Sequence, residues 1–164
     1  MQTTDRASVA PGAVATKPAA AVFRLIYRSR SKIPEAEADA ALGDILRVAR
    51  SNNTARGITG ALMFYGGWFA QVLEGDEAAI QTLFKAIAAD TRHSSVQVTE
   101  QGTVAARAFG RWAMANVGEH GAPDVPRVAT ATGTAEGAPW RLDEAQEGVV
   151  LVLRDLTRGY GIGA

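Results

Sequence analysis

The sequence predicts an α+β fold on the ferredoxin-like plan, with a five-stranded mixed sheet, two helices on one face and a C-terminal helix covering the other. Two observations support this prediction. Segments with alternating apolar residues and segments with apolar residues at every third or fourth position follow one another in the order β-α-β-β-α-β-β. A further helical segment comes last, and it can cover the sheet face that the first two helices leave open.

The first strand and the first helix are predicted from residue periodicity. Val22–Ser29 alternates apolar and polar residues, as strands do. A helix follows from Pro34, because proline is favoured in a first helical turn and the acidic residues after it suit the positive end of the helix dipole. Gly57 is expected to end this helix. Asn53 continues its apolar stripe and is therefore expected on the packed side; the stripe consists of Leu42, Ile45, Leu46 and Ala49.

A β-hairpin and a second helix are predicted next. Strand-like runs at Thr59–Tyr65 and Trp68–Glu74 are separated by two glycines, which is a strong hairpin pattern. Asp76 is a candidate N-cap for the following helix. The run Asp90–His93 is expected to end that helix, whose apolar residues follow the i, i+3, i+4, i+7 pattern: Ile80, Leu83, Phe84 and Ile87.

Two more strands and a last helix complete the pattern. Val96–Thr103 and Trp112–Val117 are predicted as the fourth and fifth strands. A helix is predicted over 140–158, because the apolar residues there keep helical spacing. Five consecutive apolar residues within it also suit a strand, but the longer periodicity favours a helix.

The expected organisation has four parts. Residues 1–20 are predicted to be a disordered tail, because they are rich in Ala, Thr and Pro and lack the apolar core of a signal peptide. Residues 21–118 form the expected domain, 119–139 a linker rich in Gly, Ala, Thr and Pro, and 140–164 a helical extension. Since no apolar stretch approaches the roughly 20 residues that span a bilayer, the cytoplasm is the expected location.

The composition excludes several classes of function. The 164 residues carry 17 basic and 17 acidic side chains, so the formal net charge is zero and nucleic acid is not an expected partner. The absence of cysteine excludes disulfides, thiolate metal sites and cysteine nucleophiles. Only two histidines are present and they lack ligand spacing, so no metal site is expected.

Two polar side chains fall where the period-2 pattern predicts core. Tyr27 shares its strand face with apolar neighbours, and Gln71 lies between Phe69 and Leu73 on its own face. A buried amide without hydrogen-bond partners costs roughly 1–3 kcal/mol. We therefore expect Gln71 to be satisfied by the Tyr27 hydroxyl, by Asn53 or by a bound polar heterocycle.

Five segments of the chain carry a resemblance to a known family: Phe23–Ser29, Asn52–Gly60, Phe69–Gly75, Asp90–His93 and Phe109–Met114. In this order and spacing they resemble the BLUF family, blue-light sensors that use FAD. The resemblance covers about residues 22–117. It implies a flavin-binding domain of the short, single-domain type, with no enzymatic activity of its own.

The resemblance implies a role for each matching residue. Tyr27 matches the electron and proton donor, and Gln71 matches the amide between that donor and the flavin. Asn53 matches the residue that pairs with the polar edge of the ring. Trp112 and Met114 match photoactive positions near the glutamine. The remaining implied FAD-binding residues flank the ring or form the rim of the site: Ile45, Ile87, Asn52, Asp90, Arg92 and His93.

The implied function is that of a blue-light photoreceptor with non-covalently bound FAD, with FMN or riboflavin as alternatives. Light-driven transfer of an electron and a proton from Tyr27 would rearrange the hydrogen bonds of Gln71, by rotation or tautomerisation of the amide. The resulting red-shifted state would pass through the fifth strand and the C-terminal extension to a protein partner. A homo-oligomer is expected. Many family members carry Ser at Ala49 and Arg at Ala86, so these two positions depart from the pattern.

Other readings remain open for the residues taken singly. An acylphosphatase-like hydrolase on the same plan would use an arginine, Arg28 or Arg56, to bind an anion and Asn53 to orient water. A small-ligand or subunit-interaction module would need no chemistry. Each residue also has a plain structural reading, such as a core tyrosine with its hydroxyl at the rim, or an asparagine that ends a helix. A flavin absorption spectrum separates these hypotheses.

Overall fold

A computed structural model describes residues 21–118, 120–121, 123–125 and 142–157. Within these residues, five strands form one sheet in the spatial order β4-β1-β3-β2-β5. β1 pairs antiparallel with β3 and β4, β2 pairs antiparallel with β3, and β5 runs parallel to β2, so the sheet is mixed. The strands are β1 (Val22–Ser31), β2 (Thr59–Tyr65), β3 (Trp68–Gly75), β4 (His93–Val104) and β5 (Ala115–Val117).

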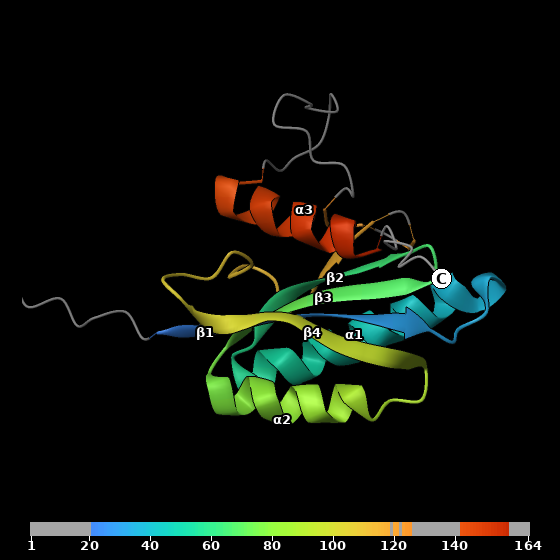
Figure 1. The fold of residues 1–164 in the computed structure, drawn as a ribbon, viewed down its shortest axis with the longest axis horizontal. Helices are drawn as coiled ribbons and strands as arrows, with labels where there is room; N and C mark the ends of the chain where they lie inside the picture. The colour runs from blue at the N-terminus through green and yellow to red at the C-terminus, as the bar shows by residue number, and fades with distance from the viewer. Residues whose placement is uncertain (1–20, 119, 122, 126–141, 158–164) are drawn as a thin grey trace, which may run out of the picture.

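The helices lie on both faces of this sheet (Figure 1). α1 (Ala38–Arg56) and α2 (Glu77–Ala88) pack on one face, and α3 (Glu144–Thr157) lies across the other. A short 3-10 turn, η1 (Glu35–Glu37), leads into α1. This arrangement confirms the predicted α+β, ferredoxin-like fold with its C-terminal helix as cover.

The ends of the helices and the hairpin follow the predicted local chemistry. Gly57 ends α1 in the left-handed conformation with φ of 64°, and its N–H group bonds the carbonyl oxygens of the last helical turn. The Asp76 carboxylate caps α2 by accepting a hydrogen bond from the Ala79 N–H at 3.0 Å. Both hairpin glycines, Gly66 and Gly67, have positive φ, as the tight turn between β2 and β3 requires.

The period-2 pattern of the strands divides the core in two. Leu25 and Leu73 face α1 and α2, where they are fully buried. Ile26 and Val72, one residue away in each strand, face α3 and pack with Leu153. Because adjacent strand residues point to opposite faces, every polar residue of a strand is assigned by its register to one of these two layers.

The fifth strand is shorter than predicted. The sequence prediction of Trp112–Val117 is wrong for its first half, since β5 comprises only Ala115–Val117. The physical reason is that residues before Ala115 bond elsewhere. The Trp112 carbonyl accepts from the Gly60 N–H at 3.1 Å, and the next two carbonyls accept from side chains of α1. Parallel pairing with β2 therefore begins only at Ala115.

A buried carboxylate fixes the turn between β4 and β5. Glu74 is fully buried on the α3 side and forms an ion pair with Arg24 at 2.7 Å. Its two oxygens also accept hydrogen bonds from the N–H groups of Ala108 and Phe109, each at 2.9 Å. This role of Glu74 was not predicted from the sequence. A buried charge with this many partners holds a turn that lacks regular structure.

The chain continues along the sheet edge after β5. The N–H groups of Asp124 and Val125 donate to the Asn116 carbonyl, and Val125 is fully buried. The proposed boundaries at residues 118 and 139 stay predictions. The predicted tail and most of the predicted linker lie outside the described residues. Within the described part of the chain, no helix combines the length and apolar character needed to cross a bilayer.

Candidate functional site

A cavity of about 150 Å³ lies between α1 and α2, over the sheet. Its residues come from three places: the centre of the sheet, one side of α1, and the end of α2 with the turn after it. Nine of them were predicted from the sequence, and the structure brings all nine to this cavity: Tyr27, Ile45, Asn52, Asn53, Gln71, Ile87, Asp90, Arg92 and His93.

The register of two strands brings Tyr27 and Gln71 together at the sheet surface of the cavity. They are direct partners in the antiparallel pairing of β1 with β3. The Tyr27 hydroxyl donates a hydrogen bond to Gln71 Oε1 at 2.5 Å, and both side chains are buried. This distance is at the short end of the range for O–H···O bonds. Of the partners expected for the Gln71 amide, the Tyr27 hydroxyl is therefore the one that bonds its oxygen.

Burial raises the pKa of the Tyr27 phenol, and the nearby negative charge of Asp90 raises it further. The hydroxyl therefore stays protonated at neutral pH and remains a donor. The ring of Phe84 packs against the phenol with centroids 5.3 Å apart, which fixes the ring beside the cavity.

The other end of the Gln71 amide meets Met114. Gln71 Nε2 donates to the Met114 sulfur at 3.3 Å, and Met114 is almost fully buried. A thioether sulfur is a weak acceptor, so the amide nitrogen is less strongly bonded than the amide oxygen. The structure separates the two residues that the sequence paired here. Trp112 packs with Phe109 and the α3-side core, 6.0 Å between ring centroids, and does not line the cavity.

Asn53 connects α1 to the segment before β5. It lies on the packed side of the helix, as its spacing predicted, and is 1% exposed. Its Nδ2 group donates to the Ala113 carbonyl at 2.8 Å. The side chain therefore has a structural partner as well as a place in the cavity wall.

The mouth of the cavity carries an ion pair. The Arg92 guanidinium donates to both carboxylate oxygens of Asp90, with the shortest contact at 2.5 Å. This hydrogen bond lowers the pKa of Asp90 to about 2, against a smaller opposing effect of burial. Asn52 lies exposed on the α1 side of the same mouth. Charged and amide groups at the opening suit a polar ligand tail.

His93 is a buried connector beside the cavity. Its Nε2 lies 2.6 Å from the Ile87 carbonyl oxygen, and its Nδ1 lies 2.7 Å from the Ser29 hydroxyl. A carbonyl oxygen can only accept, so Nε2 carries the proton and donates. In a neutral ring Nδ1 then accepts from Ser29. His93 thereby ties the end of α2 to β1 and holds one wall of the cavity in place.

Apolar side chains from the two helices face the cavity. Ile45 and Ile87 were predicted in this role, and Ala49 lines the same space. Four further lining residues were not predicted from the sequence. The periodicity of the sequence could have identified them. Each shares a helix or strand face with a predicted cavity residue, or pairs with one on the neighbouring strand: Val48, Leu62, Phe69 and Leu83.

The two departures from the family pattern differ in location. Ala49 is part of the cavity lining. Ala86 and its neighbour Lys85 are exposed on α2 and outside the lining. Only the Ala49 position therefore bears directly on the shape of the cavity.

These residues fit a flavin ring. Two apolar walls suit the faces of a flat aromatic ring, while the Gln71 and Asn53 amides suit its polar edge. The Gln71 Nε2 group donates only to the Met114 sulfur among the described residues, and a thioether sulfur is a weak acceptor. An oxygen or nitrogen atom of a ligand would accept a stronger hydrogen bond from this group than the sulfur does. Arg92 at the mouth offers a guanidinium group to phosphate groups, with two of its nitrogens already bonded to Asp90.

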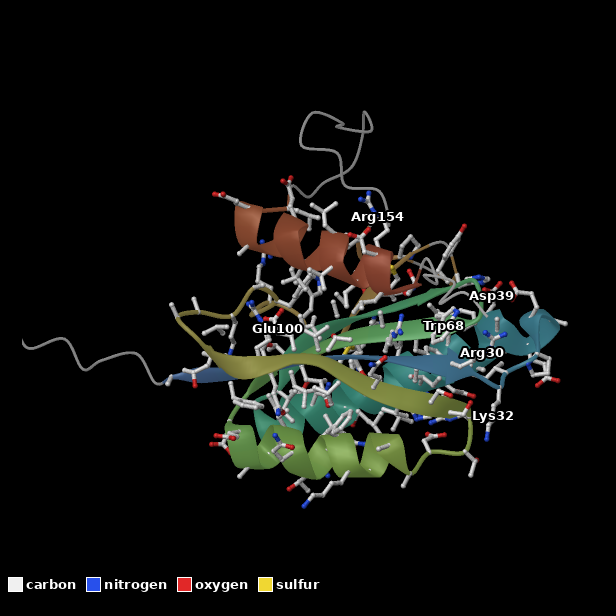
Figure 2. All side chains as sticks on the ribbon, in the orientation of Figure 1. Arg30, Lys32, Asp39, Trp68, Glu100 and Arg154 are labelled. Carbon is white, nitrogen blue, oxygen red and sulfur yellow. The ribbon has the colours of Figure 1, made fainter. Side chains whose placement is uncertain are left out.

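The residues proposed for a hydrolase do not come together. Arg28 lies over the ring of Trp68, 5.3 Å from its centroid, and so belongs to the α3 side of the sheet. Arg30 stacks on the same ring at 5.5 Å, and Figure 2 shows the labelled side chains of Arg30 and Trp68 next to each other. Asn53 lies on the opposite side, in the cavity. Arg56 is exposed at the end of α1 and does not line the cavity.

Comparison with known proteins adds an independent finding. A family model described as "Sensors of blue-light using FAD" matches residues 22–115. Over 91 residues the chain is 37% identical to photoactivated adenylate cyclase subunit beta of Euglena gracilis, an alignment that covers 56% of this chain and 11% of the cyclase. The chain therefore spans about a tenth of the length of that curated relative.

Solved structures with sequence identity above 30% are also similar. The photo-activated state of BlsA matches with a TM-score of 0.56 and 32% identity, covering 58% of this chain and 68% of BlsA. The dark-state structure of BlrB matches with a TM-score of 0.55 and 34% identity, covering 58% of this chain and 71% of BlrB.

Proposed function

The chain belongs to the BLUF family of blue-light sensors that use FAD, and we propose that it is a photoreceptor without enzymatic activity, switched by Tyr27 and Gln71. The observation that carries this proposal is the 2.5 Å hydrogen bond between the Tyr27 hydroxyl and Gln71 Oε1 at the wall of a cavity. A phenol and an amide in direct contact form a hydrogen-bonded donor–acceptor pair, along which a proton can move once the phenol has lost an electron.

The cavity residues divide into three binding roles in this proposal. Ile45 and Ile87 would hold the two faces of the ring. Asn53 and Gln71 would bond its polar edge and fix its orientation. Arg92 at the mouth would meet the phosphate groups of the tail, together with the other rim residues Asn52, Asp90 and His93. FAD is the proposed cofactor, and FMN or riboflavin would use the same ring site.

The proposed response begins at Tyr27. When bound, the flavin supplies the light absorption and, in its excited state, an oxidant able to take an electron from a phenol. Loss of an electron makes the Tyr27 hydroxyl strongly acidic, and Gln71 Oε1 is positioned to accept its proton. Return of the electron and proton to Tyr27 then leaves the Gln71 amide rotated or tautomerised.

The changed amide alters the hydrogen bonds in the cavity. In the present geometry Gln71 accepts from Tyr27 and donates to Met114. After the rearrangement the amide would present a different donor to the ligand edge, and a stronger donor there shifts the absorption to the red. Met114 bonds the end of the Gln71 amide opposite to Tyr27, so it would sense the change directly.

We assign the output to β5 and α3. Met114 directly precedes β5, and α3 packs on β2 and β3 across the sheet from the cavity. The outer side of α3 exposes two large apolar residues, Leu151 and Val152. This side would contact a protein partner or a second copy of the chain, with the cytoplasm as the proposed location.

A difference absorption spectrum tests the photoreceptor proposal. The purified protein should be yellow, and blue illumination should move the flavin band to the red, reversibly in the dark. The cofactor released by heat should chromatograph as FAD. A colourless protein after reconstitution with FAD, or a spectrum unchanged by light, would contradict the proposal.

Substitutions on α3 test the proposed output separately. Deleting α3 would expose Val150 and Leu153, which are buried against the sheet, so point substitutions are the better choice. The double variant Leu151→Asp, Val152→Asp should keep the red shift and lose any light-dependent change in assembly, measured by size-exclusion chromatography in light and dark. A light-dependent change that survives would place the output elsewhere.

A further inference from the structure

We propose that Arg50 is a positioning residue that holds Met114 against Gln71, and that Asp124 in turn holds Arg50. This inference rests on the proposed function, in which Gln71 is the light-switched amide and Met114 is in contact with it. Arg50 does not line the cavity, so it would act through the backbone of Met114.

Arg50 connects α1 to two separate segments. Its Nε group donates to the Met114 carbonyl oxygen at 3.0 Å, and its Nη2 group donates to Asp124 Oδ2 at 2.6 Å. Because the guanidinium group is planar and rigid, its two hydrogen bonds fix each other's direction. The position of the Met114 backbone is thus coupled to the position of the Asp124 carboxylate.

Asp124 is itself anchored to β5. The Oδ2 atom that accepts from Arg50 also accepts from the Asn116 N–H at 2.7 Å, and the Asp124 N–H donates back to the Asn116 carbonyl at 2.9 Å. The carboxylate therefore joins α1 to the strand that follows Met114. The residue after Asp124, Val125, is fully buried and forms a β-bridge with Val117, so the segment that carries Asp124 is also held against β5.

The segment before β5 depends on these side-chain bonds because it lies outside the sheet pairing. Residues Ala113 and Met114 precede the first paired residue, Ala115. Their carbonyl oxygens accept from Asn53 and Arg50, which are three residues apart on one side of α1. Helix α1, rather than the sheet ladder, sets where the Met114 sulfur meets Gln71 Nε2.

The competing reading is an ordinary surface ion pair. The side chains of Arg50 and Asp124 are 45% and 32% exposed, and ion pairs at such positions contribute little to stability. This reading explains the contact between the two charges. It does not explain why the same guanidinium bonds the carbonyl of a buried methionine. The two readings predict different effects on Met114.

The test uses the full chain with four single substitutions and one double variant. Arg50→Met removes both hydrogen bonds, and Arg50→Lys keeps the charge but loses the two-armed geometry. Asp124→Asn keeps an acceptor but removes the negative charge. Arg47→Met is the matched control, because Arg47 lies one turn earlier on α1 and bonds only the exposed Asp44 among the described residues.

Hydrogen exchange gives a readout that needs no flavin. In flavin-free protein, Arg50→Met should speed amide exchange at residues 113–117 by about tenfold relative to wild type, while β1 (Val22–Ser31) exchanges as before. Asp124→Asn should act in the same region to a smaller degree. If residues 113–117 respond no more than β1, or no more than in Arg47→Met, the proposal is overturned.

The dark-recovery rate gives the second readout. In flavin-loaded protein, Arg50→Met and Arg50→Lys should change the recovery rate by about threefold or more, and Arg47→Met should leave it unchanged. An Arg50→Met, Asp124→Asn double variant should match Arg50→Met alone, because both changes break one network. Recovery at the wild-type rate in Arg50→Met would overturn the positioning role. A wild type without any light response would instead refute the proposed function, and the exchange experiment would still decide the Arg50 inference.

Discussion

Gln71 and Met114 are 43 residues apart in the chain, and the amide nitrogen of the first donates to the sulfur of the second at 3.3 Å. The same amide accepts from Tyr27 through its oxygen. One end of Gln71 thus has a strong partner and the other a weak one. A rotated amide would point its oxygen at a sulfur that carries no hydrogen, so a bound ligand must compensate any such change.

Removal of the Tyr27 hydroxyl should abolish the light response and leave flavin binding intact. Tyr27→Phe keeps the ring that packs on Phe84 but removes the group that bonds Gln71. We expect normal flavin occupancy and no red shift, together with a loss of stability of about 1 kcal/mol from the hydrogen bond. Difference spectra after blue illumination measure the shift. Tyr65→Phe, outside the cavity lining, is the control and should respond as wild type does.

Gln71→Leu should also bind flavin and show no red shift. The substitution keeps an apolar side chain of similar size in the core but removes both the acceptor for Tyr27 and the donor to Met114. Infrared difference spectra should lose the amide band of the light state as well. The exposed Gln101 in β4 provides a matched control, Gln101→Leu. A normal red shift in Gln71→Leu would show that this amide is not the switch.

Asn53→Ala should mainly affect how the cofactor is held. The variant loses an amide in the cavity wall and the hydrogen bond to the Ala113 carbonyl. We expect flavin occupancy after purification to fall by several-fold, measured from the ratio of absorbance at the flavin and protein bands. Ser51→Ala, on the exposed side of α1, should keep full occupancy. Equal occupancy in both variants would remove Asn53 from the binding set.

The pKa of Tyr27 predicts how stability changes at alkaline pH. Burial, with a smaller contribution from the Asp90 charge, raises the folded-state pKa above its unfolded value of about 10. The contribution of the protonated Tyr27 phenol to the free energy of unfolding is therefore fully present below about pH 10. It is lost as the pH rises further, by at most about 1.4 kcal/mol per pH unit. Urea unfolding on both sides of this pH measures it. Tyr27→Phe should show a shallower decline, and equal slopes would contradict the prediction.

Glu74→Ala should destabilise the fold without a specific effect on light sensing. It leaves Arg24 without its partner and frees the N–H groups of Ala108 and Phe109. Removing one member of a buried ion pair costs roughly 3–5 kcal/mol. Chemical denaturation should show this loss, and the folded fraction should keep the wild-type red shift. The control Glu100→Ala, at an exposed position of β4, should change stability by less than about 0.5 kcal/mol.

Part of the site was predictable from the sequence because it depends on local periodicity. The two-residue repeat of strands placed Tyr27 and Gln71 on the buried face, and the spacing of α1 placed Asn53 on the packed side. The ends of the helices followed from Gly57 and Asp76, whose conformations and caps are local. These features need only a few neighbouring residues to be determined.

Tertiary structure alone decided the contacts of the segment before β5. The family resemblance put both Met114 and Trp112 near Gln71, but it could not show that Met114 meets the amide while Trp112 turns to the α3 side, since both lie in a stretch without regular pairing. Nor could it show that Arg50 and Asp124 meet across the fold. Such contacts join segments far apart in the chain, and their partners are chosen by distance and hydrogen-bond geometry, which leave no repeat in the sequence.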